Sequence, residues 1–269
     1  MVKQEAKTTG GKEISPKTVE NEIKSEVVSV QQETKQEENI FSNLPEKRLP
    51  DFEGLLKAGV HFGHQKGRWN PKADGYIFGE KNKVHIINLQ DTLKGLEKAL
   101  NKIEQIKKSN GKILFLGTKR QVRKIVEHAA KITQMPYVTE RWLGGTLTNF
   151  GTIKKRVEKL LDLETRDKEG KLNHYTKKER SMLRKQIQDF EKNMGGLRTL
   201  RELPNAIVIV GIKEENTAFR EAKKTNIPVI AISDTNVDPE LIDFPIPGND
   251  DAVRSVELIM SHIVREIKN

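Results

Sequence analysis

Two short runs of continuously apolar residues constrain the fold of this chain most strongly. Ile113–Leu116 and Ile207–Val210 contain no polar side chain. A strand of this kind is typical of the centre of a parallel sheet, where helices cover both faces. The chain is therefore expected to form an α/β domain built on a parallel sheet.

Other short strands and amphipathic helices are expected around these two runs. The strand candidates are Tyr76–Phe78, His85–Asn88, Lys112–Leu116, Tyr137–Val138, Ala206–Val210, Val229–Ser233 and Phe244–Ile246. The helix candidates are Asp91–Lys108, Lys119–Ile132, Thr217–Lys224 and Asp250–Ile267. Asp91 is the expected N-cap of the first helix, since a carboxylate accepts hydrogen bonds from the first free N–H groups.

The segment from 152 to 201 interrupts this alternation, because it contains no strand pattern. Ile153, Val157 and Leu160 are spaced by four and three residues, and apolar residues recur in the same way from Leu183 to Met194. A polar turn containing Gly170 separates the two halves. This pattern predicts an antiparallel coiled-coil protrusion inserted into the sheet domain, although an ordinary packed pair of helices has the same spacing.

Residues 1–48 have a different composition, rich in Lys, Glu, Gln, Thr and Ser. Such a segment cannot bury enough apolar surface to offset its chain entropy. We expect a disordered N-terminal extension over 1–48, with a transient helix from Val19 to Val30. The α/β sheet domain is then formed by 49–151 and 202–269, and 152–201 forms the protrusion.

Charge is distributed unevenly among these parts. The whole chain has a net charge of +10. Residues 49–151 carry 18 Lys and Arg against 9 Asp and Glu, residues 152–201 carry 15 against 8, and residues 202–269 carry 7 against 12. A basic first half favours a polyanionic partner, either nucleic acid or an anionic membrane surface.

Several function classes are excluded by what the sequence lacks. It has no cysteine, so disulfides, thiolate metal sites and cysteine nucleophiles are absent, and a reducing cytoplasm suits the chain. No apolar run is long enough for a membrane span or a secretory signal. No Ser-His-Asp set or complete nucleotide-binding glycine motif is present, so we expect neither an enzyme nor a bound cofactor.

The segment from Gly59 to Lys72 interleaves rings and cations on a glycine-rich loop. Cations bind phosphates, and flat rings stack on unpaired bases, so this mixture is typical of RNA recognition. The alternative is that the rings pack onto the sheet and only the cations face RNA. His61 and His64 have a spacing that suits a metal, but no third ligand lies nearby. The RNA-binding candidates here are His61, His64, Lys66, Arg68, Trp69, Asn70 and Lys72.

Three further segments carry candidate RNA contacts. Gly117–Lys124 follows a strand and opens a helix, where N–H groups and cations favour a phosphate. Arg141 precedes a paired-glycine loop that either contacts RNA or orients the protrusion. Cations also lie on both helices of the protrusion. The candidates are Lys119, Arg120, Arg123, Lys124, Arg141, Lys154, Lys155, Arg156, Lys177 and Lys178.

The carboxylates after Ser233 have a simpler interpretation. Asp234 and Asp238 follow a strand, as catalytic or metal-binding carboxylates often do. No histidine base or phosphate loop lies beside them in the sequence, and Asp and Asn are common in turns. We therefore predict turn and cap roles, and no metal site.

Many of these segments, in this order, resemble the second protein of the small subunit of the bacterial ribosome. The resemblance extends from about Phe52 to Ile267. The residues that carry it are Ala58–Gln65, Arg68–Lys72, Tyr76–Gly79, His85–Leu89, Gly117–Arg120, Arg141–Asn149, Asp234–Asn236 and Ile246–Asp251.

This resemblance implies a flavodoxin-like parallel sheet with an inserted antiparallel coiled coil, and a structural protein without enzymatic activity. It also implies binding to small-subunit ribosomal RNA and to neighbouring proteins, including the large first protein, which such proteins help to recruit. Two departures limit it. The family begins near Leu49, and it often has Asp where this chain has Gly211.

Two alternatives stay open at this point. One is a flavodoxin-like enzyme that binds a phosphate ligand between Gly117–Arg120 and Asp234–Asp238. The other is an RNA-binding assembly factor that acts outside the ribosome. The main hypothesis is a cytoplasmic component of the small ribosomal subunit, with no membrane or small-molecule partner.

Overall fold

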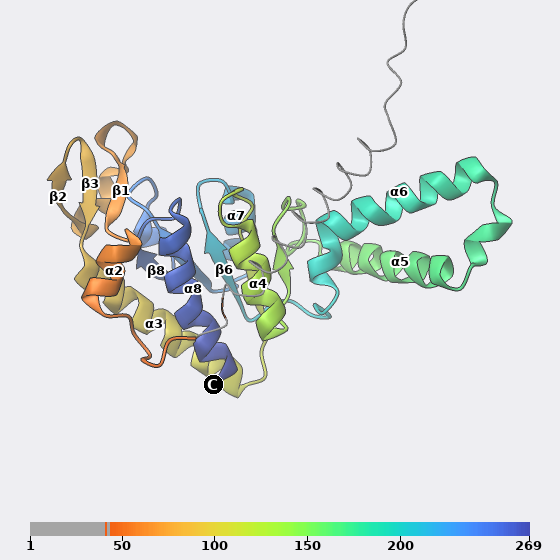
Figure 1. Cartoon of the computed structure of the whole chain (residues 1–269), viewed down its shortest axis with the longest axis horizontal. Helices are drawn as coiled ribbons and strands as arrows, with labels where there is room; N and C mark the ends of the chain where they lie inside the picture. Colours follow the sequence, from red (N-terminus) through yellow and green to blue (C-terminus); the bar gives the residue numbers. More distant parts are fainter. Residues whose placement is uncertain (1–40, 42–43) are drawn as a thin grey trace, which may run out of the picture. The chain divides into compact units, whose positions relative to one another are not determined.

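The computed structural model describes residue 41 and residues 44–269 (Figure 1). Within it, Asn43–Asn269 forms one compact unit. The predicted disordered extension, with its transient helix at Val19–Val30, lies outside the described residues apart from residues 41 and 44–48. Arg48 is part of the compact unit, because its guanidinium contacts the carboxylates of Glu104 and Glu266 at 3.0 and 3.1 Å.

A five-stranded parallel sheet forms the centre of this unit, as the sequence predicted. Its strand order is β5-β4-β6-β7-β8, and all four pairings are parallel. β4, β6 and β7 are buried along their whole length. The strands are β4 (Ile113–Leu116), β5 (Tyr137–Val138), β6 (Ala206–Val210), β7 (Val229–Ser233) and β8 (Phe244–Pro247).

Helices cover both faces of the sheet (Figure 1). One face packs against α3 (Leu89–Lys108), α4 (Arg123–Thr133) and α8 (Val253–Lys268), which also contact one another. The other face packs against α7 (Asn216–Lys224), whose Ala218 and Ala222 belong to the same buried cluster as Ile207 and Ile209. This arrangement explains why β4 and β6 contain no polar side chain. No helix in the described part of the chain is long and apolar enough to cross a membrane.

The first predicted strands belong to a second sheet, so their assignment to the parallel sheet was wrong. β1 (Phe62–Gln65), β2 (Ile77–Lys81) and β3 (Val84–Ile87) form an antiparallel sheet of order β1-β3-β2. β2 and β3 are joined by Asn82 and Lys83, both with positive φ, which makes a tight hairpin. β1 and the preceding helix α2 (Phe52–Ala58) were not predicted from the sequence.

Two long helices form the predicted insertion between β5 and β6. α5 (Phe150–Lys168) and α6 (Lys177–Met194) contact each other along a hairpin (Figure 1). Gly170 has a φ of 71° just after α5, and Thr176 and Glu179 form a capping box at the start of α6. The helix pair is therefore present, whereas a coiled-coil seam between its arms stays a prediction.

Helix starts differ from the predictions by up to four residues. α3 begins at Leu89, and its cap is Asn88, whose side chain accepts from the backbone N–H of Gln90 at 3.1 Å. The predicted cap, Asp91, instead accepts from the side-chain amide of Asn88. α4 begins at Arg123, so Lys119 and Arg120 lie in the loop before the helix.

Candidate nucleic-acid interface

The strand order reverses between β4 and β6, and the candidate ligand-binding edge of the sheet lies at the carboxyl ends of these two strands. From β4 the chain passes to β5 on one side and then returns to β6 on the other. In open α/β sheets, ligands bind beyond the carboxyl ends of the strands at such a reversal. Here the loops that follow β4 and β6 begin with Gly117 and Gly211.

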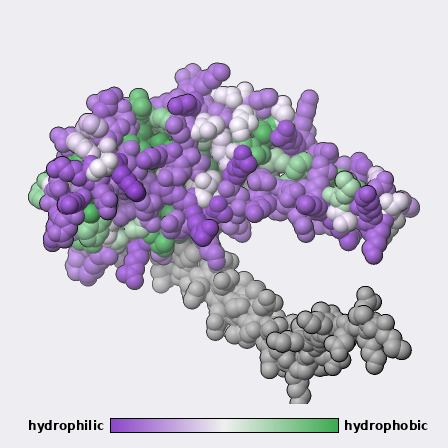
Figure 2. Space-filling model, turned by 90° about the horizontal axis from the view of Figure 1, so that it is seen from above, coloured by the Kyte–Doolittle hydropathy of each residue, from purple (hydrophilic) through white to green (hydrophobic). Residues whose placement is uncertain are grey.

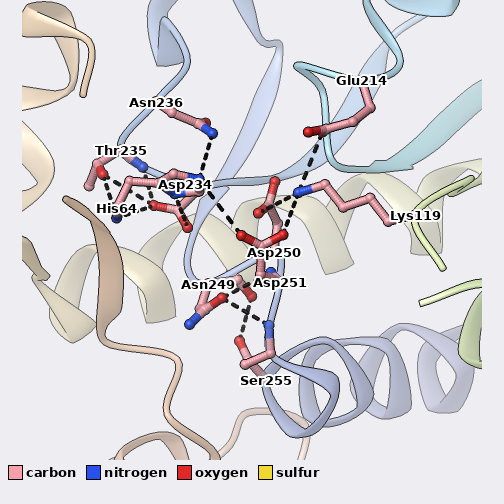
Figure 3. Close-up of polar contacts among 11 residues, drawn as sticks. His64, Lys119, Glu214, Asp234, Thr235, Asn236, Asn249, Asp250, Asp251 and Ser255 are labelled. Carbon is pink, nitrogen blue, oxygen red and sulfur yellow. Dashed lines mark hydrogen bonds and ion pairs between the residues drawn. The ribbon is translucent and has the colours of Figure 1, made fainter. Parts of the chain in front are cut away.

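The Lys119 side chain fills this reversal point (Figure 3). Its ammonium lies 2.8 Å from a carboxylate oxygen of Asp250, 2.9 Å from Asp251 and 3.4 Å from Glu214. The side chain is only 8% exposed, and that of Asp250 is 2% exposed. A cation with three carboxylate partners in a buried position holds three segments of the chain together.

Gly211 makes room for this lysine. Its φ is +84°, and a Cβ at this position would lie 2.6 Å from Cε of Lys119. A side chain here would therefore need both a strained backbone and a displaced lysine. The departure from the resemblance at this position thus has a steric reason in this chain.

Burial and the neighbouring charges shift the pKa values of Lys119 and Asp250. Burial alone would lower the pKa of Lys119, but the carboxylates of Asp250, Asp251 and Glu214 outweigh burial and raise it. Burial raises the pKa of Asp250 to about 6, and the nearby carboxylates of Asp234 and Asp251 add to this rise. Lys119 opposes it. Ionisation of the buried Asp250 therefore opposes folding.

The burial of Asp250 predicts a pH dependence of stability. The pKa of Asp250 in the folded chain, about 6, exceeds its ordinary value of 3.8. Its stabilising contribution is therefore complete below 3.8 and is lost as the pH rises through about 6. We expect the free energy of unfolding of the wild type, relative to Asp250→Asn, to fall on the order of 2 kcal/mol over that range. Denaturant unfolding at a series of pH values checks this, and a difference that does not change with pH would contradict it.

His64, in β1, joins the loop after β7 to the antiparallel sheet. Its Nδ1 lies 2.9 Å from a carboxylate oxygen of Asp234, and its backbone N–H donates to Asp234 and Thr235. Its Nε2 lies 3.1 Å from the Asn236 amide and 3.7 Å from Asp251. The hydrogen bond to Asp234 raises the pKa of His64. This predicted RNA contact therefore has internal partners on both ring nitrogens.

The turn roles predicted for Asp234 and Asp238 are seen in the structure. Asp234 accepts from the backbone N–H of Thr235, and Asp238 accepts from that of Glu240 at 3.0 Å. Among residues 41 and 44–269, no three His, Asp or Glu side chains are grouped so that they could hold a metal.

The other candidates in the first segment divide into packed and exposed residues. The His61 ring packs on Phe62, and the Trp69 ring packs on His85 with centroids 5.1 Å apart. The Asn70 backbone donates to the carbonyl of Thr235 at 2.7 Å, and its side chain accepts from the backbone of Lys72. Trp69 therefore packs against a buried ring, whereas Phe62 is 47% exposed, and which of these rings face RNA stays a prediction.

The cations of the same segment are exposed. Lys66 pairs with Glu80, and Lys72 pairs with Asp238, both at 2.8 Å between nitrogen and oxygen. Arg68 is also exposed and has no hydrogen bond or ion pair within the described part of the chain. Arg68 is therefore the candidate in this segment best placed to contact a phosphate.

The loops after β4 and β5 lie side by side, because these strands are parallel neighbours. Arg123 joins them: its Nε donates to the carbonyl of Thr118, and its Nη1 donates to Glu140. Arg120 and Arg141, one on each loop, are exposed and have no partner among residues 44–269. Lys124 is exposed on α4.

A buried carboxylate beneath the second loop binds its backbone. Glu221, on α7, accepts from the backbone N–H groups of Gly145, Leu147 and Thr148 at 2.7, 3.0 and 3.2 Å. It also accepts from Nε1 of Trp142 at 3.1 Å. Burial alone would raise the pKa of Glu221, but these donors lower it. The carboxylate thus stays ionised inside the protein.

The hairpin carries its candidates at both ends. Lys154, Lys155 and Arg156 lie in the second turn of α5, and Lys177 and Lys178 begin α6. All five are exposed, and none has an internal partner within the described residues. With a rise of 1.5 Å per residue, the two groups are separated by roughly 20 Å along the hairpin.

Sequence reasoning missed the carboxylates that organise this edge. Glu221 and Asp250 were assigned only to the predicted helices Thr217–Lys224 and Asp250–Ile267, and Glu214 and Glu215 were given no role. Glu221 lies on the buried side of α7 together with Ala218 and Ala222. A charged residue in the buried stripe of a helix is the signal that could have found it.

Comparison with known proteins places the chain among ribosomal proteins. Residues 55–269 match the family model described as ribosomal protein S2. The small ribosomal subunit protein uS2 of Fusobacterium nucleatum is 50% identical over 214 residues, which cover 79% of this chain and 87% of that protein. The uS2c protein of Cyanophora paradoxa is 48% identical over 213 residues, 79% of this chain and 91% of its own length. The uS2 protein of Spiroplasma citri is 51% identical over 78% of this chain, but this covers 59% of that longer protein.

Proposed function

Because this chain belongs to the ribosomal protein S2 family, we propose that it binds small-subunit ribosomal RNA through exposed, unpaired cations at the carboxyl edge of its sheet and on its hairpin. The chain is a structural protein of the small ribosomal subunit, and it is not an enzyme. Its partners are ribosomal RNA and other ribosomal proteins. The finer proposal concerns which surfaces make these contacts.

The absence of internal partners around exposed cations supports this proposal most directly. A cation already paired with a carboxylate must give up that partner to bind a phosphate, whereas an unpaired cation only releases water and a counterion from the phosphate. In the described part of the chain, the unpaired candidates are Arg68, Arg120, Arg141, Lys154, Lys155, Arg156, Lys177 and Lys178.

Within this proposal, paired candidates have smaller roles. Lys119 is buried among carboxylates, so we assign it the role of holding the loop that presents Arg120. His64 holds β1 against the loop after β7, and Arg123 joins two loops. Lys66 pairs with the partly exposed Glu80, and such a pair is weak enough to exchange for a phosphate. Lys72 pairs with Asp238, whose side chain is 13% exposed, so we assign Lys72 a smaller part in phosphate binding.

The filled reversal point argues against the phosphate-ligand alternative. The Lys119 side chain occupies the place at which a flavodoxin-like protein would bind a ligand, and five carboxylates lie nearby: Glu214, Glu215, Asp234, Asp250 and Asp251. A phosphate there would meet strong repulsion.

For the large first protein of the small subunit, we propose a separate apolar surface. Phe52 and Leu56 on α2, together with Phe78 on β2, line a groove of about 340 Å³. Phe78 is 80% exposed. Figure 2 shows that the surface is largely hydrophilic, with small hydrophobic patches. Exposed aromatic side chains around a groove are typical of a protein-docking site.

Sedimentation tests the main proposal. We expect the chain to migrate with small ribosomal subunits in a cell lysate, in stoichiometric amount, and to stay bound through a high-salt wash. Quantitative immunoblotting of the gradient fractions measures the amount of the chain that is bound to the subunit. A predominant free pool would instead favour an assembly factor outside the ribosome, and would overturn the RNA surface proposed here.

The docking proposal is tested with Phe78→Asp in the same gradients. The variant should fold and remain on the subunit, because Phe78 is exposed, while the large first protein is lost from the subunit by tenfold or more. Met182→Asp on α6 is the matched control, since Met182 is 65% exposed but lies outside the groove. Equal retention of the large first protein in both variants would refute this surface.

A further inference from the structure

Two buried carboxylates of one helix segment hold the two loops that carry Arg120 and Arg141. Glu215 directly precedes α7, and Glu221 lies within it. Glu215 accepts from the backbone N–H of Thr118 at 2.9 Å and from the Thr118 hydroxyl. Glu221 accepts from the loop that follows Arg141.

The contacts of Glu221 resemble those of a bound anion. Three backbone N–H groups, an indole N–H and the Thr148 hydroxyl converge on its two oxygens. Gly145 has a φ of +88°, a conformation that turns its N–H toward the carboxylate. The loop between β5 and α5 is therefore folded around a side chain from a different part of the chain.

Glu215 has the corresponding position beneath the first loop. It is 3% exposed, and within the described residues it accepts hydrogen bonds from the N–H and the hydroxyl of Thr118. Burial raises its pKa, and Thr118 opposes that shift. Thr118 is adjacent to Lys119 and two residues from Arg120, so this contact fixes the start of the exposed turn.

We infer that Glu215 and Glu221 are positioning residues for RNA binding, and that α7 sets the distance and orientation between the Arg120 and Arg141 loops. Neither carboxylate contacts RNA itself, because both are buried. This inference rests on the proposed function, since it requires that the two arginines bind RNA. Beyond that function, it assigns to α7 the relative position of Arg120 and Arg141.

A double-mutant cycle tests the inference. The probe is the small ribosomal subunit stripped of this protein, and the measurement is rebinding of the full chain over a salt series. Arg141→Ala should lower the slope of log affinity against log salt by roughly 0.7 to 0.9, the value of one phosphate contact. Glu221→Gln should lower it by a similar amount, because the amide places N–H groups against the loop N–H groups. The double variant should show no further decrease.

Ala222→Gly is the matched control for lost stability. It weakens α7 but leaves both carboxylates, so the slope should be unchanged and Arg141→Ala should have its full effect in that background. Additive effects of Glu221→Gln and Arg141→Ala, or an unchanged slope in Glu221→Gln, would overturn the inference alone. If Arg120→Ala and Arg141→Ala both leave the slope unchanged, the RNA surface itself is wrong and the inference is overturned with it.

Discussion

Replacement of Lys119 by methionine is expected to destabilise the protein by about 3 kcal/mol or more at neutral pH. Removing one partner of a buried ion pair leaves the other charge without compensation, at a cost of about 3 to 5 kcal/mol. Asp250 would be the partner left behind, since its side chain is 2% exposed, and at neutral pH it must either stay ionised without Lys119 or take up a proton. Chemical unfolding of the two proteins measures the difference.

Two controls separate this effect from the loss of any lysine. Lys94→Met removes an ammonium that pairs with Asp91 but is 68% exposed, and it should cost at most about 1 kcal/mol. Adding Asp250→Asn to Lys119→Met should restore part of the lost stability. A loss for Lys119→Met no larger than for Lys94→Met would show that the cluster contributes little to folding.

Neutralisation of Arg68, Arg120 and Arg141 together should produce the largest loss of RNA affinity. Each is exposed and unpaired within the described residues. If each binds one phosphate, changing all three to glutamine lowers the salt slope of subunit rebinding by roughly 2 to 3. At low salt, the affinity should fall by at least tenfold, since each lost contact weakens binding.

The matched control removes the same charge elsewhere. Lys57, Lys94 and Lys108 each form an exposed ion pair within one helix. Changing these three to glutamine should leave the salt slope nearly unchanged. Equal slopes for the two triple variants would mean that RNA binding reflects only the net charge of the chain, and would contradict the proposed surface.

The sequence was sufficient for the parallel sheet, because the pattern is local. Ile113–Leu116 and Ile207–Val210 are apolar on both faces, and this alone indicates central strands. The antiparallel sheet was not predicted as a separate one. Strands β1, β2 and β3 are short and polar on one side, and the pairing of Phe62 with Ile86 across 24 positions cannot be read from local periodicity.

Predictions of the site were limited for a different reason. The residue types and segments were identified, but their partners come from distant parts of the chain. In the sequence, Lys119 and Arg120 are two adjacent cations that cannot be told apart. In the structure, Lys119 is buried against Asp250, which lies 131 positions later, whereas Arg120 is exposed. Such pairings depend on strand order, which no motif in this sequence specifies.

The insertion of the hairpin between β5 and β6 has a consequence for the order of folding. Ile113 of β4 pairs with Ala206 of β6, 93 positions later, whereas Ile207 of β6 pairs with Val229 of β7 only 22 positions later. Loop closure costs more entropy for the longer separation, so β6, β7 and α7 should assemble before β4 joins them. Formation of the α5–α6 hairpin shortens the open loop, and thereby makes this late step faster.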